Sequence, residues 1–375
     1  MVHNPLYAHA AGLTKGRSRE LDLIKATAII FVLLVHAVPT VMLVLAGPFL
    51  CFQAVPLFLL ASAVSWSRAM AAREPSRRLG SHFTVKFLKR LFVRVFVPFF
   101  IVTACLVIYK IAQGENWQSV GFHLLKYGGY GPGCYYPWVF AQAALIFPLL
   151  WVISDMKQPK ESIRLCMVFA LSVGLDAILN LLQVSDKAYR LMIIRYVFLL
   201  YLGIILARGK AFSLLMLLVL GGGGLIYLTL SLYFRVRFEP VLHPAFPGAH
   251  APAGGWSLVL ALLVCWATGF VRPRPRVAKV VEMLSKASYG IFVTQMAFFW
   301  LTRPIMLRLL PTTKNLQGVV NSSIRVAVSV PICLAAGFMW YAVRSRLARN
   351  KTRVRPSSSY ISPVSPNPSS PFRET

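Results

Sequence analysis

The stretch DLIKATAIIFVLLVHAVP, residues 22–39, decides the class of fold. It is long and apolar enough to form a bilayer-spanning helix, yet it holds Lys25 near one end and His36 in its middle. Similar apolar runs recur along the chain of 375 residues, of which 57% are hydrophobic, and the mean hydropathy is +0.65. Because these runs are too long and continuous for barrel strands, they predict an all-α, polytopic integral membrane protein.

We expect about ten membrane-spanning helices, each close to the roughly 20 residues that a bilayer requires. An even number of spans places both termini on the same side. The basic residues are densest at Arg68 to Arg90, Arg272 to Lys286 and Arg344 to Arg355, and the positive-inside rule makes that side the cytoplasm. The expected spans are residues 24–44, 48–67, 91–111, 134–154, 164–183, 190–207, 212–233, 256–271, 287–306 and 323–343.

The net charge of +29 is therefore explained by the orientation of the chain in the membrane and by attraction to anionic lipid head groups. We expect no nucleic acid as a partner. The chain is predicted to be a multi-pass protein of the inner (cytoplasmic) cell membrane. The six cysteines show no paired metal-ligand spacing, so we expect no metal site and no bound cofactor.

One folded domain is expected. Residues 1–20 form a polar cytoplasmic N-terminus, and residues 21–345 form the transmembrane domain. Residues 346–375 are a basic, then Pro/Ser-rich cytoplasmic tail, which we predict to be disordered because it cannot bury enough apolar surface to offset the entropy of ordering.

Lys25 and His36 are the first candidate functional residues, because ionisable groups inside a span are costly and usually have a function or a partner. They are eleven residues apart, almost three helical turns, so they share one helix face about 16 Å apart along the axis. Asp22, three residues before Lys25, can pair with it on that face. Of the seven histidines, His36 alone lies well inside an expected span, where it suits either general-base chemistry on a hydroxyl or a packing hydrogen bond to another helix.

A second candidate is the basic segment KFLKRLFVRVFVPF, residues 86–99. Arg90 and Arg94 have the i, i+4 spacing of one helix face at the cytoplasmic end of the third span. Such a pair can grip the phosphates of an anionic donor. The alternative, favoured on sequence alone, is positive-inside anchoring.

Polar and aromatic residues in two further segments complete the set. One segment is GPGCYYPWVFAQ, residues 131–142, which contains Tyr135 and Tyr136. The favoured interpretation of these tyrosines is an aromatic belt at the membrane interface, and the alternative is a surface on which a sugar stacks. Asp176, in the fifth span, either pairs with a basic group such as Arg195 or belongs to a substrate path, and the sequence leaves both open.

These segments together resemble the acyltransferase 3 family, the membrane-integral O-acyltransferases that decorate bacterial surface glycans. The first span of that family carries Arg or Lys, ten residues and then His, which Lys25 and His36 match. Further segments are similar to family motifs in the same order and extend the resemblance from residue 20 to about residue 345: AVPLFLLASAVSW (54–66) with Ser62, KRLFVRVFVP (89–98) with Arg90 and Arg94, GPGCYYPWVFAQAALIFPLL (131–150), IIRYVFLLYLGIIL (193–206) with Arg195, and LSKASYGIFVTQMAFF (284–299) with Gln295.

Two positions depart from the family pattern. Gln295 stands where many relatives have histidine, and Ala63 follows Ser62 where the family commonly has Ser-Gly. The first departure leaves His36 as the plausible intramembrane imidazole.

The resemblance implies a cytoplasmic acyl-CoA, expected to be acetyl-CoA, as co-substrate and a hydroxyl of a glycan or lipid-linked sugar as acceptor. Lys25, Arg90 and Arg94 would bind the donor, Asp22 would hold Lys25, and His36 would take the acceptor's proton or carry the acyl group. The residues assigned to a possible substrate path are Ser62, Tyr135, Tyr136, Asp176, Arg195 and Gln295.

Two other classes of function stay open on the sequence. One is a proton-coupled transporter or flippase that uses His36 and Asp176 without covalent chemistry. The other is a catalytically silent partner in a glycan-synthesis complex. The identity of the acceptor, the length of the acyl chain and the oligomeric state do not follow from the sequence.

Overall fold

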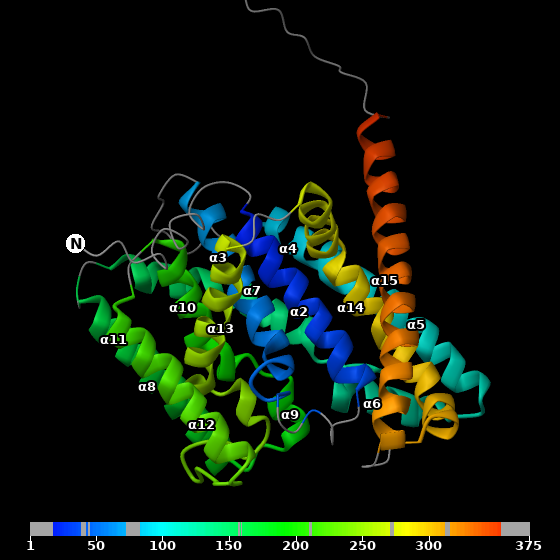
Figure 1. Ribbon diagram of the computed structural model, residues 1–375, viewed down its shortest axis with the longest axis horizontal. Helices are drawn as coiled ribbons and strands as arrows, with labels where there is room; N and C mark the ends of the chain where they lie inside the picture. Colours follow the sequence, from blue (N-terminus) through cyan, green and yellow to red (C-terminus); the bar gives the residue numbers. More distant parts are fainter. Residues whose placement is uncertain are drawn as a thin grey trace, which may run out of the picture.

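The computed structural model describes residues 18–38, 43, 46–72, 83–156, 158, 160–209, 212–270, 274–311 and 316–353. Within these ranges the regular structure is helical and contains no β-strand, which confirms the predicted all-α class (Figure 1). The α-helices are α2 (Arg19–Ala37), α3 (Ala54–Ala71), α4 (Val85–Leu91), α5 (Val97–Ala112), α6 (Trp117–Tyr127), α7 (Tyr136–Asp155), α8 (Glu161–Leu181), α9 (Asp186–Arg190), α10 (Val197–Ala207), α11 (Leu214–Leu217), α12 (Gly223–Leu232), α13 (Ala251–Phe270), α14 (Pro275–Leu309) and α15 (Leu316–Arg353).

Two π-helical segments make longer helices out of shorter ones. Phe92–Phe96 joins α4 to α5, and Leu218–Gly222 joins α11 to α12. With these joins, seven helical segments of the described chain are long and apolar enough to cross a membrane. They are Cys51–Ala71, Val85–Ala112, Tyr136–Asp155, Glu161–Leu181, Leu214–Leu232, Pro275–Leu309 and Leu316–Leu347.

The other three predicted spans overlap α2, α10 and α13. The segments Ile194–Ala207 and Ala251–Ala267 are apolar but shorter, and the first two turns of α2 carry several charges. These long apolar helices indicate an integral membrane protein. The number of ten membrane crossings and the cytoplasmic position of both termini stay predictions. Residues 1–17 and 354–375, most of the predicted terminal segments, lie outside the described residues, and α15 continues to Arg353.

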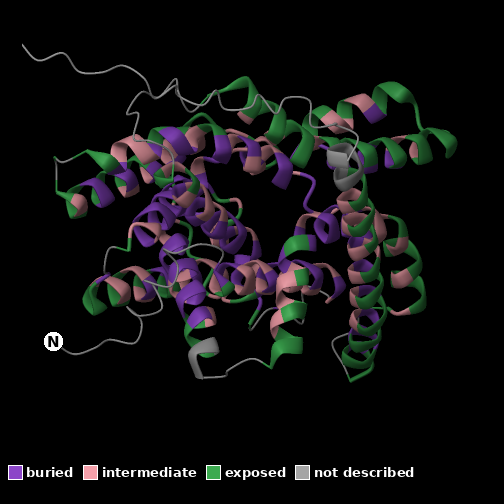
Figure 2. Cartoon of the chain, turned by 90° about the horizontal axis from the view of Figure 1, so that it is seen from above, coloured by how far each residue is buried: buried purple, intermediate pink, exposed green. Residues whose placement is uncertain are grey.

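Helix α2 occupies the centre of the helical assembly. It packs against α3, α13, α14 and α15, and these neighbours surround it in Figure 1. Ile24, Ala28, Ile29, Val32 and Leu33 are buried along it. Figure 2 shows that exposed residues lie mainly on the peripheral helices. Many of these exposed residues are large and apolar, which is the pattern of helices that face lipid. The candidate residues of α2 are therefore held by protein on most sides.

The ends of α2 differ from the expected span 24–44. Ser18 caps the start, because its side chain accepts a hydrogen bond from the Leu21 backbone N–H at 3.3 Å. The helix ends at Ala37, and Val38 is extended with φ −91° and ψ 133°. Pro39 follows in the sequence, and the residue before a proline is disfavoured in the helical region. His36 consequently lies in the last turn of α2, and not in the middle of a longer helix.

Candidate functional site

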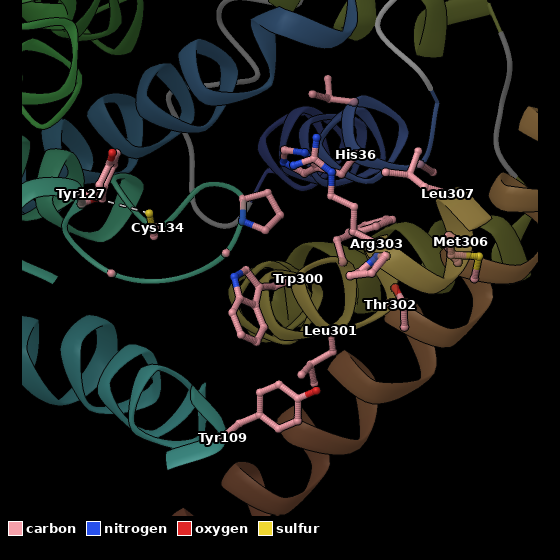
Figure 3. Close-up of a pocket in the computed structure, with 18 of the residues that line it drawn as sticks. His36, Tyr109, Tyr127, Cys134, Trp300, Leu301, Thr302, Arg303, Met306 and Leu307 are labelled. Carbon is pink, nitrogen blue, oxygen red and sulfur yellow. Dashed lines mark hydrogen bonds between the residues drawn. The ribbon is translucent and has the colours of Figure 1, made fainter. Parts of the chain in front are cut away.

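A cavity of about 1050 Å³ lies at the C-terminal end of α2, and His36 is part of its wall. The rest of the wall comes from the end of α5, from α6, from the loop before α7, from the end of α9, from the C-terminal half of α14 and from α15 (Figure 3). The site thus gathers segments that are far apart in the sequence. A volume of this size is at the upper end of the range typical of small-molecule pockets.

His36 is half-buried in this wall. Its ring centroid lies 5.8 Å from that of Phe299 on α14, and the two rings are tilted by 55°. No hydrogen bond joins the imidazole to any residue that the structure describes. Of the two roles open on the sequence, a packing hydrogen bond is therefore not the one observed, and the ring is accessible to a molecule in the cavity.

The glycine-rich loop that precedes α7 forms one side of the cavity. Gly129, Gly131 and Gly133 have φ values of 147°, 89° and 86°, in the region that favours glycine. A Cβ on Gly131 would meet the Met296 carbonyl oxygen at 2.7 Å, so the loop packs directly on the backbone of α14. The loop is therefore a tightly packed wall of the cavity.

Side chains also tie this loop down. The Gln295 amide donates from Nε2 to the Pro132 carbonyl at 3.2 Å, and the Trp138 indole N–H donates to the Gly128 carbonyl at 2.7 Å. Gln295 is fully buried, and its Oε1 has no hydrogen-bond partner among the described residues. Gln295, which stands where many members of the resembled family have histidine, therefore fixes the position of the loop and does not itself line the cavity.

Four basic side chains line the cavity, and sequence reasoning missed all of them as site residues. Lys110 forms an ion pair with Glu115, and Arg325 donates to the Leu310 carbonyl. The two others, Arg190 and Arg303, are the charged groups that act electrostatically on His36. Arg303 was detectable in the sequence, because it is an ionisable residue inside the expected span 287–306.

Lys25 lies toward the other end of α2, about 16 Å from His36 by the helical rise, and Asp22 lies almost one turn further away, at about 21 Å. Asp22 Oδ1 accepts a hydrogen bond from the Ser285 hydroxyl at 2.7 Å, which ties α2 to α14. Lys25 Nζ donates to the Ser65 hydroxyl at 3.4 Å, which ties α2 to α3. The direct Asp22–Lys25 pair stays a prediction.

Arg90 and Arg94 are both exposed. Arg90 is in α4 and Arg94 is in the π-helical segment that follows. The Arg94 carbonyl accepts a hydrogen bond from Arg344 of α15 at 3.5 Å, so a further basic side chain lies beside Arg94. The structure does not bring Arg90 or Arg94 into the cavity that contains His36.

The remaining candidates for a substrate path have packing partners. The Ser62 hydroxyl donates to the Phe58 carbonyl of its own helix at 2.8 Å. Tyr136 is buried among aromatic rings, with its centroid 5.0 Å from that of Phe292. Tyr135 is closer to the site, because the Arg190 guanidinium lies 4.5 Å from its ring centroid and Arg190 lines the cavity.

Asp176 belongs to a separate buried cluster. Its Oδ2 accepts a hydrogen bond from the His243 backbone N–H at 3.2 Å and lies 3.9 Å from His250 Nε2. Arg195 donates instead to the Arg190 carbonyl at 2.8 Å and lies over aromatic rings, among them Tyr189. The Asp176 carboxylate therefore binds a loop backbone in place of the suggested Arg195.

Both histidines of this cluster have filled hydrogen-bonding positions. His243 Nδ1 accepts from the Ala245 backbone N–H at 3.1 Å, so its Nε2 donates to the Val184 carbonyl at 2.7 Å. His250 Nε2 donates to the Ala245 carbonyl at 3.0 Å, and the Tyr227 hydroxyl bonds its Nδ1. Burial lowers the pKa of His250 to about 3, so this ring is neutral. The cluster fastens the loop before α13, and it does not line the cavity of His36.

Comparison with known proteins gives one match. A family model described as an acyltransferase domain, Acyltransferase 3, matches residues 18–341. That range contains the whole lining of the cavity and all the candidate residues at both ends of α2. No curated protein and no solved structure matches the chain.

Proposed function

Because the chain belongs to the Acyltransferase 3 family, whose model covers residues 18–341, we propose that this membrane acyltransferase is an O-acyltransferase of the cell envelope. It moves an acyl group, expected to be acetyl, from cytoplasmic acyl-CoA to a hydroxyl of a cell-envelope carbohydrate or lipid-linked sugar. The observation that carries the proposal is the position of His36, an imidazole without a protein hydrogen-bond partner in the described structure, on the wall of a cavity of about 1050 Å³.

In the proposed reaction, a nitrogen of His36 takes the proton of the acceptor hydroxyl as its oxygen attacks the thioester carbonyl carbon. The tetrahedral intermediate collapses with cleavage of the C–S bond, and the CoA thiolate leaves and takes up a proton. An acyl group carried transiently on His36 fits the same residues. Either route needs the acceptor hydroxyl and the thioester to meet at the end of α2.

The two ends of α2 support different roles. Lys25, Arg90 and Arg94 are the basic groups at the end that we expect to face the cytoplasm, and we assign them to the donor phosphates. His36 and the cavity lie about 16 Å along the helix toward the other end. The proposal therefore has donor and acceptor approach from opposite sides, with the thioester arm reaching along α2.

The transporter alternative has less support. It needs His36 and Asp176 to relay protons along one path. Asp176 and its two histidine neighbours lie outside the lining of the cavity, and their hydrogen bonds fasten a loop.

The test uses membranes that contain the protein, radiolabelled acetyl-CoA, and an extract of total glycans and lipids. We expect label in an acceptor with the wild type, and none above empty membranes with His36→Ala. Longer acyl-CoA donors are tested in parallel. If no acyl donor gives transfer while a glycan or lipid still crosses the membrane, the protein is a transporter and the proposal is wrong.

A further inference from the structure

We propose that Arg190 and Arg303 form an anion-binding site in the cavity wall, and that it holds a phosphate or carboxylate group of the acceptor. This inference rests on the proposed function, because it names the chemical class of the acceptor: a negatively charged sugar in place of a neutral one.

The first step is the charge balance of the cavity. Its lining contains four basic side chains and no aspartate or glutamate. Lys110 is compensated by Glu115, and Arg325 is bonded to a backbone carbonyl. Arg190 and Arg303 form no ion pair with any residue that the structure describes. The wall therefore carries an uncompensated positive charge, and a concave site of low dielectric concentrates its field.

The second step is the way Arg190 is held. Its guanidinium lies 4.5 Å from the ring centroid of Tyr135 and 5.1 Å from that of Phe246. Its Nε is buried and has no hydrogen-bond partner in the described part of the chain. Aromatic contacts fix the plane of the group without using its donors, so the N–H groups stay available for an anionic oxygen.

The third step is the direction of Arg303. This residue is on α14, one turn beyond Phe299, and Figure 3 shows its side chain extending from α14 toward His36. Arg190, at the end of α9, reaches the same cavity from another element. An anion between two such guanidinium groups would sit beside the imidazole, which positions a hydroxyl of the same molecule for attack.

The location assigns this site to the acceptor and not to the donor. Arg190 and Arg303 lie at the His36 end of α2, whereas Lys25, Arg90 and Arg94 lie outside the cavity lining. A CoA phosphate bound by Lys25, Arg90 and Arg94 is too far from Arg190 and Arg303 to contact them as well.

The experiment measures binding by full-length protein in nanodiscs of uncharged lipid, using titration calorimetry. The probes are methyl glucoside, methyl glucuronide and glucose 1-phosphate, which share a ring and differ in charge. We expect the two anionic probes to bind at least about tenfold more tightly than methyl glucoside, the ratio that about 1.4 kcal/mol of charge-assisted hydrogen bonding gives. Free CoA should leave their binding unchanged.

Variants assign the effect to the named side chains. Arg303→Gln and Arg190→Gln should bring the three affinities to within about threefold of one another, whereas Arg303→Lys should retain part of the preference. Arg308→Gln is the matched control, because Arg308 is an exposed arginine of the same helix that does not line the cavity. It should behave as the wild type.

Three results would overturn the inference: equal or absent binding of the three probes by the wild type, an unchanged preference in both glutamine variants, or displacement of the anionic sugars by CoA. If the preference for anions is present but labelled acyl groups are never transferred, the proposed function fails while the anion site stands. If labelled acyl groups are transferred but the protein shows no preference for anionic sugars, the proposed function stands and the anion site is wrong.

Discussion

The ring of His36 lies 5.8 Å from the ring of Phe299, centroid to centroid, and this contact joins the last turn of α2 to the C-terminal half of α14. Because α2 ends at Ala37, the imidazole is at a helix end that opens on the cavity. Arg303 follows Phe299 by one helical turn and so lies on the same side of α14. One packing contact therefore sets the position of the candidate base relative to a candidate binding group.

The glycine-rich wall of the cavity gives a prediction on stability. Gly131→Ala should destabilise the protein by about 2 kcal/mol more than Gly114→Ala does. Both glycines have similar φ values, 89° and 87°, so the backbone strain is matched. They differ in space, because a Cβ on Gly131 meets the Met296 carbonyl oxygen at 2.7 Å and a Cβ on Gly114 has nothing within 4 Å. Thermal unfolding of the two variants in the same detergent measures the difference, and equal melting temperatures would show that the loop does not pack on α14.

His250 gives a prediction on pH dependence. Burial lowers its pKa from 6.5 to about 3, whereas in the unfolded chain it titrates near its ordinary value. The unfolded state therefore binds a proton below about pH 6.5 that the folded state does not, and stability falls as the pH falls from that value toward 3. The slope from this one group is at most about 1.4 kcal/mol per pH unit.

The variant His250→Asn should lower stability at neutral pH, because Tyr227 and the Ala245 carbonyl lose their partner. It should also flatten the fall in melting temperature between about pH 6.5 and 4.5, since asparagine does not titrate. The slope is the informative quantity and not the absolute melting temperature. Parallel pH profiles for the wild type and the variant would mean that His250 already binds a proton in the folded state.

Lys25 gives a prediction on the donor. Lys25→Ala should raise the KM for acetyl-CoA by about tenfold, because one charge-assisted contact to a phosphate is lost, and should leave the KM for the acceptor unchanged. Lys86→Gln is the control, as Lys86 is an exposed lysine of α4 to which we assign no role. A rise in the acceptor KM alone would place Lys25 with the other substrate.

The sequence was sufficient to predict the class of fold and to single out one residue of the cavity wall, His36. The apolar runs predicted the helices, and the cost of an ionisable group inside a span pointed to His36, whereas the shared helix face of Lys25 and His36 stays a prediction. These features are local, because the helical repeat and the cost of a charge in lipid act within a single segment. Pro39 also carried the information that α2 ends early, through its effect on Val38.

The rest of the site depends on contacts between distant segments. Nothing in the sequence near Arg190 indicates that it shares a cavity with Arg303, because their proximity comes from the packing of α9 and α14 around the end of α2. The same limit applies to Asp176. Its position within a span suggested function, whereas the loop that contains His243 and His250 supplies its partners.

The measurement that tests the central claim most directly is acyl transfer by two histidine variants of purified, reconstituted protein. His36 and His123 both line the cavity, and only His36 is proposed to react. With radiolabelled acetyl-CoA and the acceptor fraction labelled by the wild type, His36→Gln should lower the rate by about 100-fold or more, the contribution typical of a general base. His123→Gln should stay within about threefold of the wild type, a change of less than 1 kcal/mol. If folded His36→Gln protein transfers label at the wild-type rate, His36 is not the base and the account of this site is wrong.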